Sequence, residues 1–462
     1  MARDGARSTR GDAGACDGEN SGNFGASKSS RADSIGAGRI ARCGWDDGRA
    51  RARASSNARA LALRSFEDVS ERSRESGSSV PSDKAFGCAW LDETALVCTK
   101  DHRLFEVELD RRRGRRPTFR EVELGRTDAF ERPSTRWLER GGFFDWFVRR
   151  SGRRELAETV GRRTGGAHAV VVSSTREHVL CSGGPDHSIV QFARDEETDF
   201  LVPRIALRGH EDVVFGLDFV NRDTLASCSR DGSVKIWQLP RASARASYVL
   251  AHPVASVLPV SGCGPQLARV RDVKTVDHLS SKQLASVTSS GLIHQFDAET
   301  LGIVGTYTCR GYIETSCMCT NGAIVAVGSR THVGLVDFRQ KKLYASVALP
   351  FGDFNSVRSL SFTPTSTSQT MLTIGGGRGN IYFYDERSRK YLMNEYGLRH
   401  QLENNKACVQ LSDSFVFDSE WAQEYLLPAI LCHQWDPTGT RLLVAGGPLQ
   451  AVLQGFFAGV WS

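Results

Sequence analysis

The 462-residue sequence lacks the long apolar stretches that a membrane-spanning helix requires. No run of about 18 consecutive apolar residues occurs. Residues 1–30 are mostly small, polar or charged and contain no apolar core of a secretory signal. We therefore expect an intracellular protein, present in cytoplasm and nucleus, with no membrane partner.

Metal-binding cysteine patterns are also absent. The twelve cysteines are scattered, and neither paired CxxC units nor a CxxC unit followed by spaced histidines occurs. Most cysteines have β-branched neighbours, as Cys98 and Cys181 do, where a free thiol packs as a small apolar group. The sequence predicts reduced, buried cysteines and no metal.

Catalytic motifs are missing too. Neither the phosphate-binding pattern GxxxxGK[ST] nor the nucleophile motif GxSxG occurs. The glycine-rich run at 375–379 joins two strand-like segments, so it offers no helix N-terminus to a phosphate. We expect a binding protein that is not an enzyme and needs no cofactor.

Charge and composition divide the chain. Residues 1–80 are rich in Arg, Ser, Gly and Ala, a composition typical of disordered chains. Within them, apolar spacing over 58–69 fits a short helix that would need a partner surface. A second basic segment, 111–164, contains two arginine clusters, and we interpret it as an insertion in the domain that surrounds it.

From residue 83 onward, short strand-like runs alternate with turns, as in an all-β fold. The clearest unit begins with Gly209-His210, continues to an Asp231-Gly232 turn and ends at Trp237. The Asp-Gly pair suits a tight turn because both residues tolerate positive φ. The unit resembles a WD repeat, and this resemblance implies that His210, Asp231 and Trp237 form an internal, structural hydrogen-bonded set.

The same unit recurs with altered residues. Copies lie at 86–109, 168–193, 209–237, 272–297, 314–339, 356–387 and 429–461. Seven copies predict a seven-bladed β-propeller over 83–462, with the basic segment as an insertion and residues 1–80 as an extension. The sequence stops after a third strand, so we expect an N-terminal segment to supply the fourth strand and close the ring.

Four cations are predicted to gather on one face of this ring. Strands in a blade alternate in direction, so the turns between second and third strands share a face with the connections between blades. Lys100 and Arg230 each precede a turn aspartate, and Arg271 and Arg358 each open a first strand. Such cations around a partly desolvated opening form an anion receptor. Separate, solvated loop charges are the alternative.

The opposite face carries a different pattern. Asp337 and Arg339 end the third strand of one blade, and Asp385 and Arg387 end that of the next. A paired aspartate would hold its arginine ready for a partner protein. Both segments resemble the D-x-R box by which WD-repeat substrate receptors bind the DNA-damage-binding adaptor of cullin-4 ubiquitin ligases. Solvated turn pairs are the alternative.

The last repeat carries a closer resemblance. HQWDPTGTRLLVAGGPL at 433–449 and FAGVWS at 457–462 are similar to the twelfth family of DDB- and cullin-4-associated factors. This resemblance implies a substrate-recognition subunit that binds acidic C-terminal tails, typically two glutamates, and presents them for ubiquitin transfer. Lys100, Arg230, Arg271 and Arg358 would then bind the tail.

Two other functions stay open. A WD-repeat scaffold without a ligase link would keep the fold and the basic opening but would have no use for Arg339 and Arg387. A nucleic-acid-binding protein would use the arginine clusters as phosphate contacts. These clusters lack regularly interleaved aromatics and lie among glutamates, so we do not expect a nucleic acid partner. They equally fit nuclear-import patches.

Overall fold

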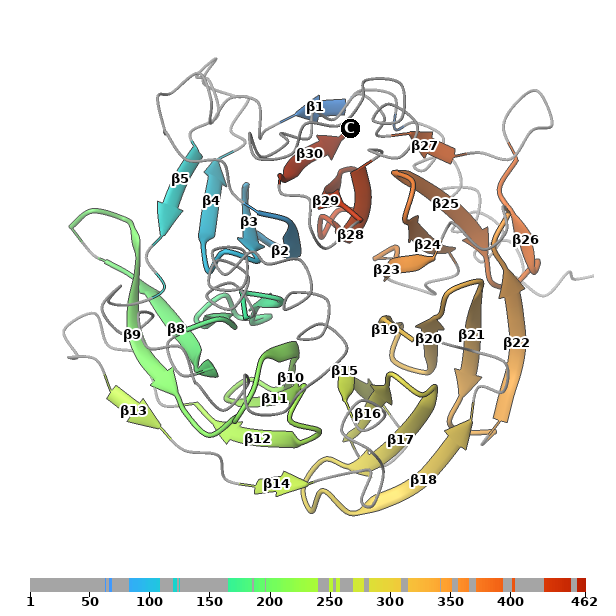
Figure 1. Cartoon of the computed structure of the whole chain (residues 1–462), viewed down its shortest axis with the longest axis horizontal. Coiled ribbons are helices and arrows are strands. Elements are labelled where there is room, and N and C mark those ends of the chain that lie inside the picture. Colours follow the sequence, from blue (N-terminus) through green and yellow to red (C-terminus); the bar gives the residue numbers. More distant parts are fainter. Residues whose placement is uncertain are drawn as a thin grey trace, which may run out of the picture. The chain divides into compact units, whose positions relative to one another are not determined.

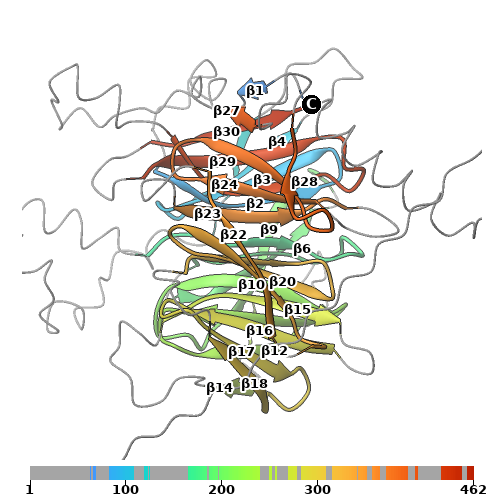
Figure 2. The ribbon, with the colours of Figure 1, turned by 90° about the vertical axis from the view of Figure 1, so that its right-hand side faces the viewer.

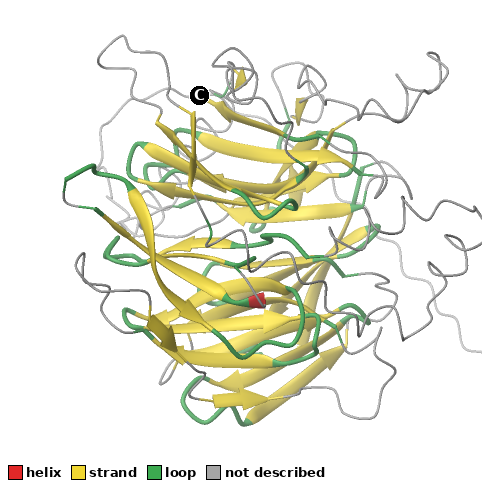
Figure 3. Cartoon of the chain, turned by 60° about the vertical axis from the view of Figure 1, so that its left-hand side comes forward, coloured by secondary structure: helices red, strands yellow, loops and turns green. Residues whose placement is uncertain are grey.

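A ring of seven sheets makes up the described part of the chain. The computed structural model describes residues 63, 66–68, 83–108, 119–122, 124, 165–184, 187–195, 197–239, 249–251, 255–257, 269–277, 282–308, 315–340, 342–350, 356–364, 371–393, 401–403, 428–449 and 455–462. Strands and loops account for nearly all of them (Figure 3). The sheets stand around a common axis (Figure 1), which confirms the predicted seven-bladed β-propeller. None of these residues belongs to a helix long and apolar enough to cross a bilayer.

Four strands, named a to d from the axis outward, form the plan of each blade. The first three blades contain β2 (Ala85–Leu91), β3 (Thr94–Thr99), β4 (Leu104–Glu108) and β5 (Phe119–Val122); β6 (Val170–Val172), β7 (Val179–Cys181), β8 (Ile189–Arg194) and β9 (Leu201–Leu207); and β10 (Val214–Asn221), β11 (Thr224–Ser229), β12 (Val234–Gln238) and β14 (Ala255–Val257). Blades 4 and 5 contain β15 (Val270–Asp277), β16 (Lys282–Thr288), β17 (Leu292–Asp297) and β18 (Ile303–Thr308); and β19 (Cys317–Thr320), β20 (Ile324–Gly328), β21 (His332–Asp337) and β22 (Lys342–Ala348).

The last two blades depart from the plan in their outer strands. Blade 6 contains β23 (Val357–Phe362), β24 (Met371–Gly376) and β25 (Asn380–Asp385), and its outer edge is divided between β26 (Lys390–Tyr391) and β27 (Gln401–Glu403). Blade 7 contains β28 (Pro428–Trp435), β29 (Leu442–Pro448), β30 (Phe457–Trp461) and β1 (Phe66–Asp68). Blade 2 also gains a fifth strand, because β13 (Val249–Ala251) pairs in parallel with β9.

Strand β1 closes the ring from the N-terminal side. It runs antiparallel to β30, with Phe66 opposite Trp461 and Asp68 opposite Gly459. Figure 1 and Figure 2 both place it beside β30, and Leu63 just before it is buried in the cluster between blades 6 and 7. The expectation that an N-terminal segment completes the last blade is confirmed.

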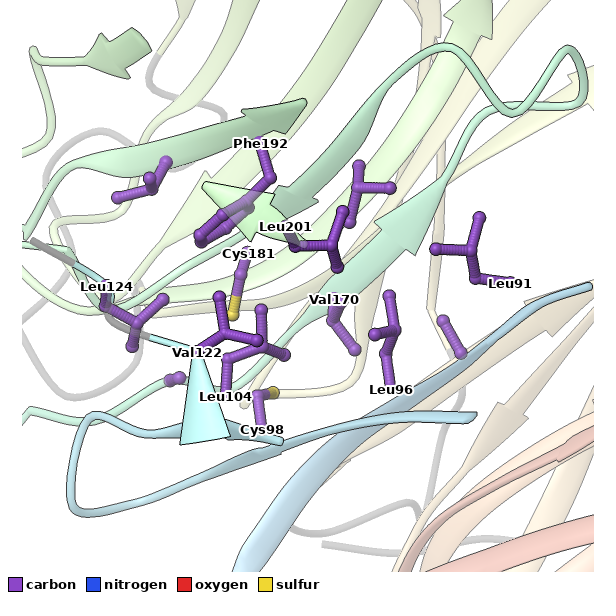
Figure 4. Packing of buried hydrophobic residues seen from close by; sticks show 14 residues of the cluster. Leu91, Leu96, Cys98, Leu104, Val122, Leu124, Val170, Cys181, Phe192 and Leu201 are labelled. Carbon is purple, nitrogen blue, oxygen red and sulfur yellow. The ribbon is translucent and has the colours of Figure 1, made fainter. Parts of the chain in front are cut away.

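Two predictions from the sequence were wrong, one of a helix and one of the start of the insertion. The helix predicted over 58–69 is replaced at Phe66–Asp68 by a strand, because an unpaired edge on β30 outweighs a marginal helical pattern. The insertion expected at 111–164 also begins too early. Its residues 119–122 form β5, and Val122 and Leu124 pack against Leu104 in the core between blades 1 and 2 (Figure 4). Apart from Leu63, the remaining residues of both segments, and the other residues of the extension predicted over 1–80, lie outside the described part.

Apolar clusters fill the spaces between neighbouring blades. One lies between blades 1 and 2 (Figure 4), and others occupy each following interface around the ring. Because both faces of each sheet are covered, the second strands are almost entirely buried, as in β24 and β29. The core is therefore distributed around the ring.

Polar bonds also join the first strands of neighbouring blades. The Asp218 Oδ2 atom accepts a hydrogen bond from the Thr275 backbone N–H at 2.6 Å, and Asp272 Oδ2 accepts one from Met318 N–H at 3.0 Å. At the closing interface, Gln434 Oε1 accepts from Trp90 N–H at 3.2 Å. These bonds satisfy inner-edge backbone groups that have no strand partner.

Five first strands contain a β-bulge. Near the start of the first strand, a register shift leaves one extra residue opposite the second strand in blades 1, 3, 4, 6 and 7, and blade 3 has another shift at its far end, at the buried Val220. A bulge re-aims the side chain of the extra residue. The five extra residues at the strand starts are half-buried: Phe86, Phe215, Arg271, Arg358 and Leu431.

Removal of β1 should destabilise the ring. We expect deletion of residues 1–70 to lower the free energy of unfolding by about 2–4 kcal/mol, because it exposes the edge of β30 and removes the buried Leu63 side chain. Deletion of residues 1–60 retains both and is the matched control. Urea denaturation of the two variants measures the difference, and equal stability would contradict the assignment of β1 as the closing strand.

Candidate functional site

The strand order gives the propeller two distinct faces. We call the face with the b–c turns and the starts of the first strands the upper face, and the face with the a–b and c–d turns the lower face. Backbone bonds tie the b–c turns of blades 1 and 3 to the start of their own first strands: Arg230 N–H donates to Val213 O at 2.9 Å, and Lys100 N–H donates to Lys84 O at 2.9 Å. Side chains from these two elements therefore share the upper face.

The structure brings His210, Asp231 and Trp237 together through a fourth residue. His210 Nδ1 lies 2.9 Å from Asp231 Oδ2, and His210 Nε2 lies 2.7 Å from Ser227 Oγ, which also accepts the Trp237 indole N–H at 2.8 Å. Burial alone would raise the pKa of Asp231, but hydrogen bonds from His210 and Ser233 hold it below its usual range. Gly232 has φ 88°, as the tight turn requires. This set has a structural role, and Ser227 was missed.

All four sequence-predicted cations lie on the upper face. Lys100 and Arg230 occupy b–c turns of blades 1 and 3, while Arg271 and Arg358 are bulge residues of blades 4 and 6. The structure therefore places two of them on turns and two at the inner rim formed by the first strands.

Two of these cations have carboxylate partners that the sequence analysis did not foresee. Lys100 Nζ lies 3.1 Å from Asp83 Oδ2, and Arg230 donates to both carboxylate oxygens of Asp212 at 2.8 and 2.6 Å. Arg358 Nε donates to Ser356 Oγ at 2.8 Å. These contacts orient the cations but reduce the net charge near Lys100 and Arg230.

Further cations on this face were missed. Lys84 and Arg269 immediately precede first strands. Burial, assisted by the charge of Lys100 and opposed by Asp83, lowers the pKa of Lys84 to about 8. Burial and the nearby charge of Arg230 lower the pKa of Arg269. Positive charge on this face is thus dense enough for cations to affect one another. A search for basic residues immediately before each predicted first strand would have identified both.

Aromatic rings accompany Arg271 on the inner rim. The Arg271 guanidinium carbon lies 5.0 Å from the centroid of the Phe215 ring, and the His168 ring meets Phe215 edge-on at 5.0 Å. His168 also stacks on Phe86 at 4.3 Å. Burial lowers the pKa of His168 to about 3, and the charges of Arg230 and Arg271 act in the same direction, so the ring is neutral near pH 7.

On the lower face, Asp337 fixes Arg339. The buried Asp337 carboxylate accepts hydrogen bonds from the Arg339 backbone N–H, Nε and Nη2 at 2.9, 3.0 and 2.9 Å. The bond from Arg339 lowers the pKa of Asp337. About half of the Arg339 side chain, 48%, stays exposed. The arginine is therefore held in one geometry at the protein surface.

Asp385 shapes the turn that carries Arg387 in the next blade. Its carboxylate accepts hydrogen bonds from the backbone N–H groups of Arg387 and Ser388, at 3.0 and 3.1 Å. The Arg387 side chain is exposed. The expectation that the aspartate holds its arginine side chain is met for Arg339, and Asp385 fixes the backbone of the turn that presents Arg387.

Side chains around these two boxes were not predicted. Tyr344 Oη donates to Glu386 Oε1 at 2.8 Å and so joins β22 to the c–d turn of blade 6, and Arg389 lies 6.0 Å above the Tyr344 ring. Exposed apolar side chains follow the c–d turns of blades 4, 5 and 6, namely Ile303, Val304, Leu343 and Met393. Charged and apolar groups together are typical of protein interfaces.

Comparison with known proteins gives the family. The sequence matches the model of the DDB1- and CUL4-associated factor 12 beta propeller over residues 153–462. The chain belongs to this family. The match, more than half of the chain, contains blades 2 to 7, whereas blade 1 precedes it. The resemblance inferred from the last repeats is confirmed, and membership in the DDB1- and CUL4-associated factor 12 family supports a substrate-receptor role in cullin-4 ligases.

The family's propeller contains buried histidines and thiols that we assign to packing. His433 Nε2 lies 2.8 Å from Thr373 Oγ1, and its Nδ1 contacts Ser359 Oγ. Burial lowers the pKa of His433 to about 3 and raises that of the Cys317 thiol to about 12. Among the residues that the structure describes, no group of three His, Cys, Asp or Glu side chains is placed to bind a metal.

The neutral state of His433 predicts a pH dependence of stability. Its folded pKa is about 3 against an ordinary 6.5, so between these values only the unfolded chain binds the proton. Stability is fully present above pH 6.5 and falls with acidification by about 1.4 kcal/mol per pH unit for this group. We expect His433→Gln to reduce the slope of unfolding free energy between pH 4 and 6 by up to this amount in urea titrations. An unchanged slope would contradict a buried neutral histidine.

Proposed function

We propose that the chain is the substrate-recognition subunit of a cullin-4 RING ubiquitin ligase, with acidic, twin-glutamate C-terminal tails bound on the upper face and the adaptor bound on the lower face. The observation that carries the proposal is the pair of Asp-x-Arg boxes on consecutive c–d turns of a propeller from the DDB1- and CUL4-associated factor 12 family. Its mechanism is proximity, since a separate conjugating enzyme performs the chemistry.

The lower face suits a protein partner. Asp337 holds Arg339 at the surface, so less side-chain entropy is lost when the arginine meets a carboxylate or carbonyl. Arg387 extends from the next blade, and exposed Leu343 and Met393 offer apolar contact near the boxes. A cationic centre with apolar surroundings supports adaptor docking here.

The upper face suits an acidic peptide end. A tail with two glutamates carries three carboxylates, including the terminal one. Arg271 and Arg358 lie on the inner rim, and Lys84, Lys100, Arg230 and Arg269 stand on the adjoining turns and strand entries. Charge-assisted hydrogen bonds from arginine forks would contribute about 1.5–3 kcal/mol each. Asp83 and Asp212 already pair with Lys100 and Arg230, so they compete with a ligand for these cations. A ligand with one carboxylate would bind weakly in this competition, and a ligand with several carboxylates would be favoured.

Charge reversal of the boxes should abolish adaptor capture. We expect the double variant Arg339→Glu, Arg387→Glu to lose binding by at least about 100-fold, since two cations become repulsive at the contact. A pull-down with purified adaptor, followed by titration, measures it. Arg222→Glu is the matched control, because Arg222 is also an exposed lower-face arginine with a carboxylate partner, Glu177.

Adaptor that binds the double variant as tightly as the wild type would overturn the lower-face assignment. If the folded wild type binds no adaptor, the ligase role fails, and the alternative of a WD-repeat scaffold for protein assembly takes its place.

Charge changes on the inner rim should weaken tail binding. We expect Arg271→Ala or Arg358→Ala to reduce affinity for a peptide ending in two glutamates by about 10-fold, and the corresponding glutamate variants to reduce it further through repulsion. Fluorescence anisotropy at 50 and 300 mM salt measures both affinity and its electrostatic share. Arg222→Glu serves as the lower-face control, and equal affinity in all variants would refute this site.

A further inference from the structure

Three aromatic rings form a continuous row on the upper inner rim. Phe86, His168 and Phe215 come from blades 1, 2 and 3, and we call them the aromatic row. Successive ring centroids are 4.3 and 5.0 Å apart, and the row ends where Phe215 lies 5.0 Å beneath the Arg271 guanidinium of blade 4. The row therefore joins directly to one of the proposed carboxylate-binding cations.

The backbone is built to bring these rings together. Phe86 and Phe215 are both bulge residues, and each is followed by a glycine. A Cβ atom at Gly87 would lie 2.9 Å from the His168 carbonyl oxygen, and one at Gly216 would lie 2.8 Å from Asp272 Oδ1. Only glycine allows the next blade to come this close. The bulge then directs the preceding ring toward that blade.

The rings keep apolar surface at the rim. All three are half-buried, unlike the fully buried aromatic side chains between the blades, such as Phe192 and Phe296. The other bulge residues are Arg271, Arg358 and Leu431. The upper inner rim is thus aromatic along blades 1 to 3 and cationic at blades 4 and 6, and each part suits a different portion of one ligand.

We propose that the aromatic row is a second subsite of the tail-binding face, which selects acidic-ended peptides with an aromatic or long aliphatic side chain upstream of the acidic end. The proposal rests on the proposed function, because Arg271 must hold a carboxylate of the tail. An extended peptide advances about 3.3 Å per residue. A chain leaving Arg271 along the row therefore brings the side chain about two to four residues upstream onto Phe215, His168 and Phe86.

Paired peptides test the subsite without changing the protein. One series ends in two glutamates and carries a single tryptophan at each of the five preceding positions in turn, with serine at the others; the reference peptide has serine throughout. With the full chain, we expect tryptophan to tighten binding about tenfold at one or two of these positions, as burial of roughly 60 Å² of apolar surface would do. The ratio of the affinity for the tryptophan peptide to that for the serine peptide should persist at 500 mM salt, while both affinities fall.

Variants locate the effect. Phe86 lies at the end of the row away from Arg271, and Phe86→Ala should remove most of the tryptophan preference by weakening the tryptophan peptide far more than the serine peptide. Leu431→Ala is the matched control, because it truncates a half-buried bulge residue of blade 7 outside the row. Its tryptophan preference should equal that of the wild type.

The outcomes separate the two levels of the proposal. Equal wild-type affinity for all peptides, or a preference that Phe86→Ala leaves intact, would overturn the subsite and leave the acidic-tail function standing. If the folded protein binds none of the peptides, the acidic-tail function fails and the subsite fails with it.

Discussion

Bonds between the first strands of neighbouring blades are the constraint on which the rest of the propeller depends. Among the strands that the structure describes, none pairs with the inner edge of a first strand, and side chains such as Asp218, Asp272 and Gln434 bind the backbone of the next blade. These bonds fix the position of each of these first strands along the ring axis relative to the first strand of the next blade. Asp272 also contacts Lys274, and it follows the bulge residue Arg271 directly. The position of the rim side chains is thus a product of blade-to-blade bonding.

The same ring separates the two proposed sites. Bulges direct Arg271 and Arg358 to the upper rim, whereas the Asp-x-Arg boxes sit at the ends of third strands on the lower face. A third strand crosses the blade from one face to the other, so the b–c turns and the c–d turns lie on opposite faces. The proposed tail and the proposed adaptor would therefore bind separate surfaces of the ring.

The sequence predicted what repeats and turns encode. Asp231-Gly232 and Trp237 identified one blade, and the recurrence of this unit along the sequence located the other six blades and indicated that a closing strand was needed.

The sequence analysis missed features that depend on contacts between residues far apart in the sequence. Near Phe66, pairing with the free edge of β30 stabilises a strand more than the apolar spacing stabilises a helix. Strand β5 lies in a basic stretch with few apolar residues, so its pairing with β4 left little signal in the sequence. The carboxylates Asp83 and Asp212 and the row from Phe86 to Phe215 come from separate blades or turns. In both Asp-x-Arg boxes the aspartate also accepts the backbone N–H of its arginine, a turn bond that the sequence pattern alone did not indicate.

The pairing of β1 with β30 sets an order of events during folding. The two strands come from opposite ends of the described sequence, so their contact closes the longest loop in the molecule. On the ribosome, the N-terminal strand emerges first and waits until the final blade has been made. During that interval β30's future partner and the open side of blade 1 are accessible to other chains. Ring closure is therefore a late step, and the exposed edges persist until the last blade has formed.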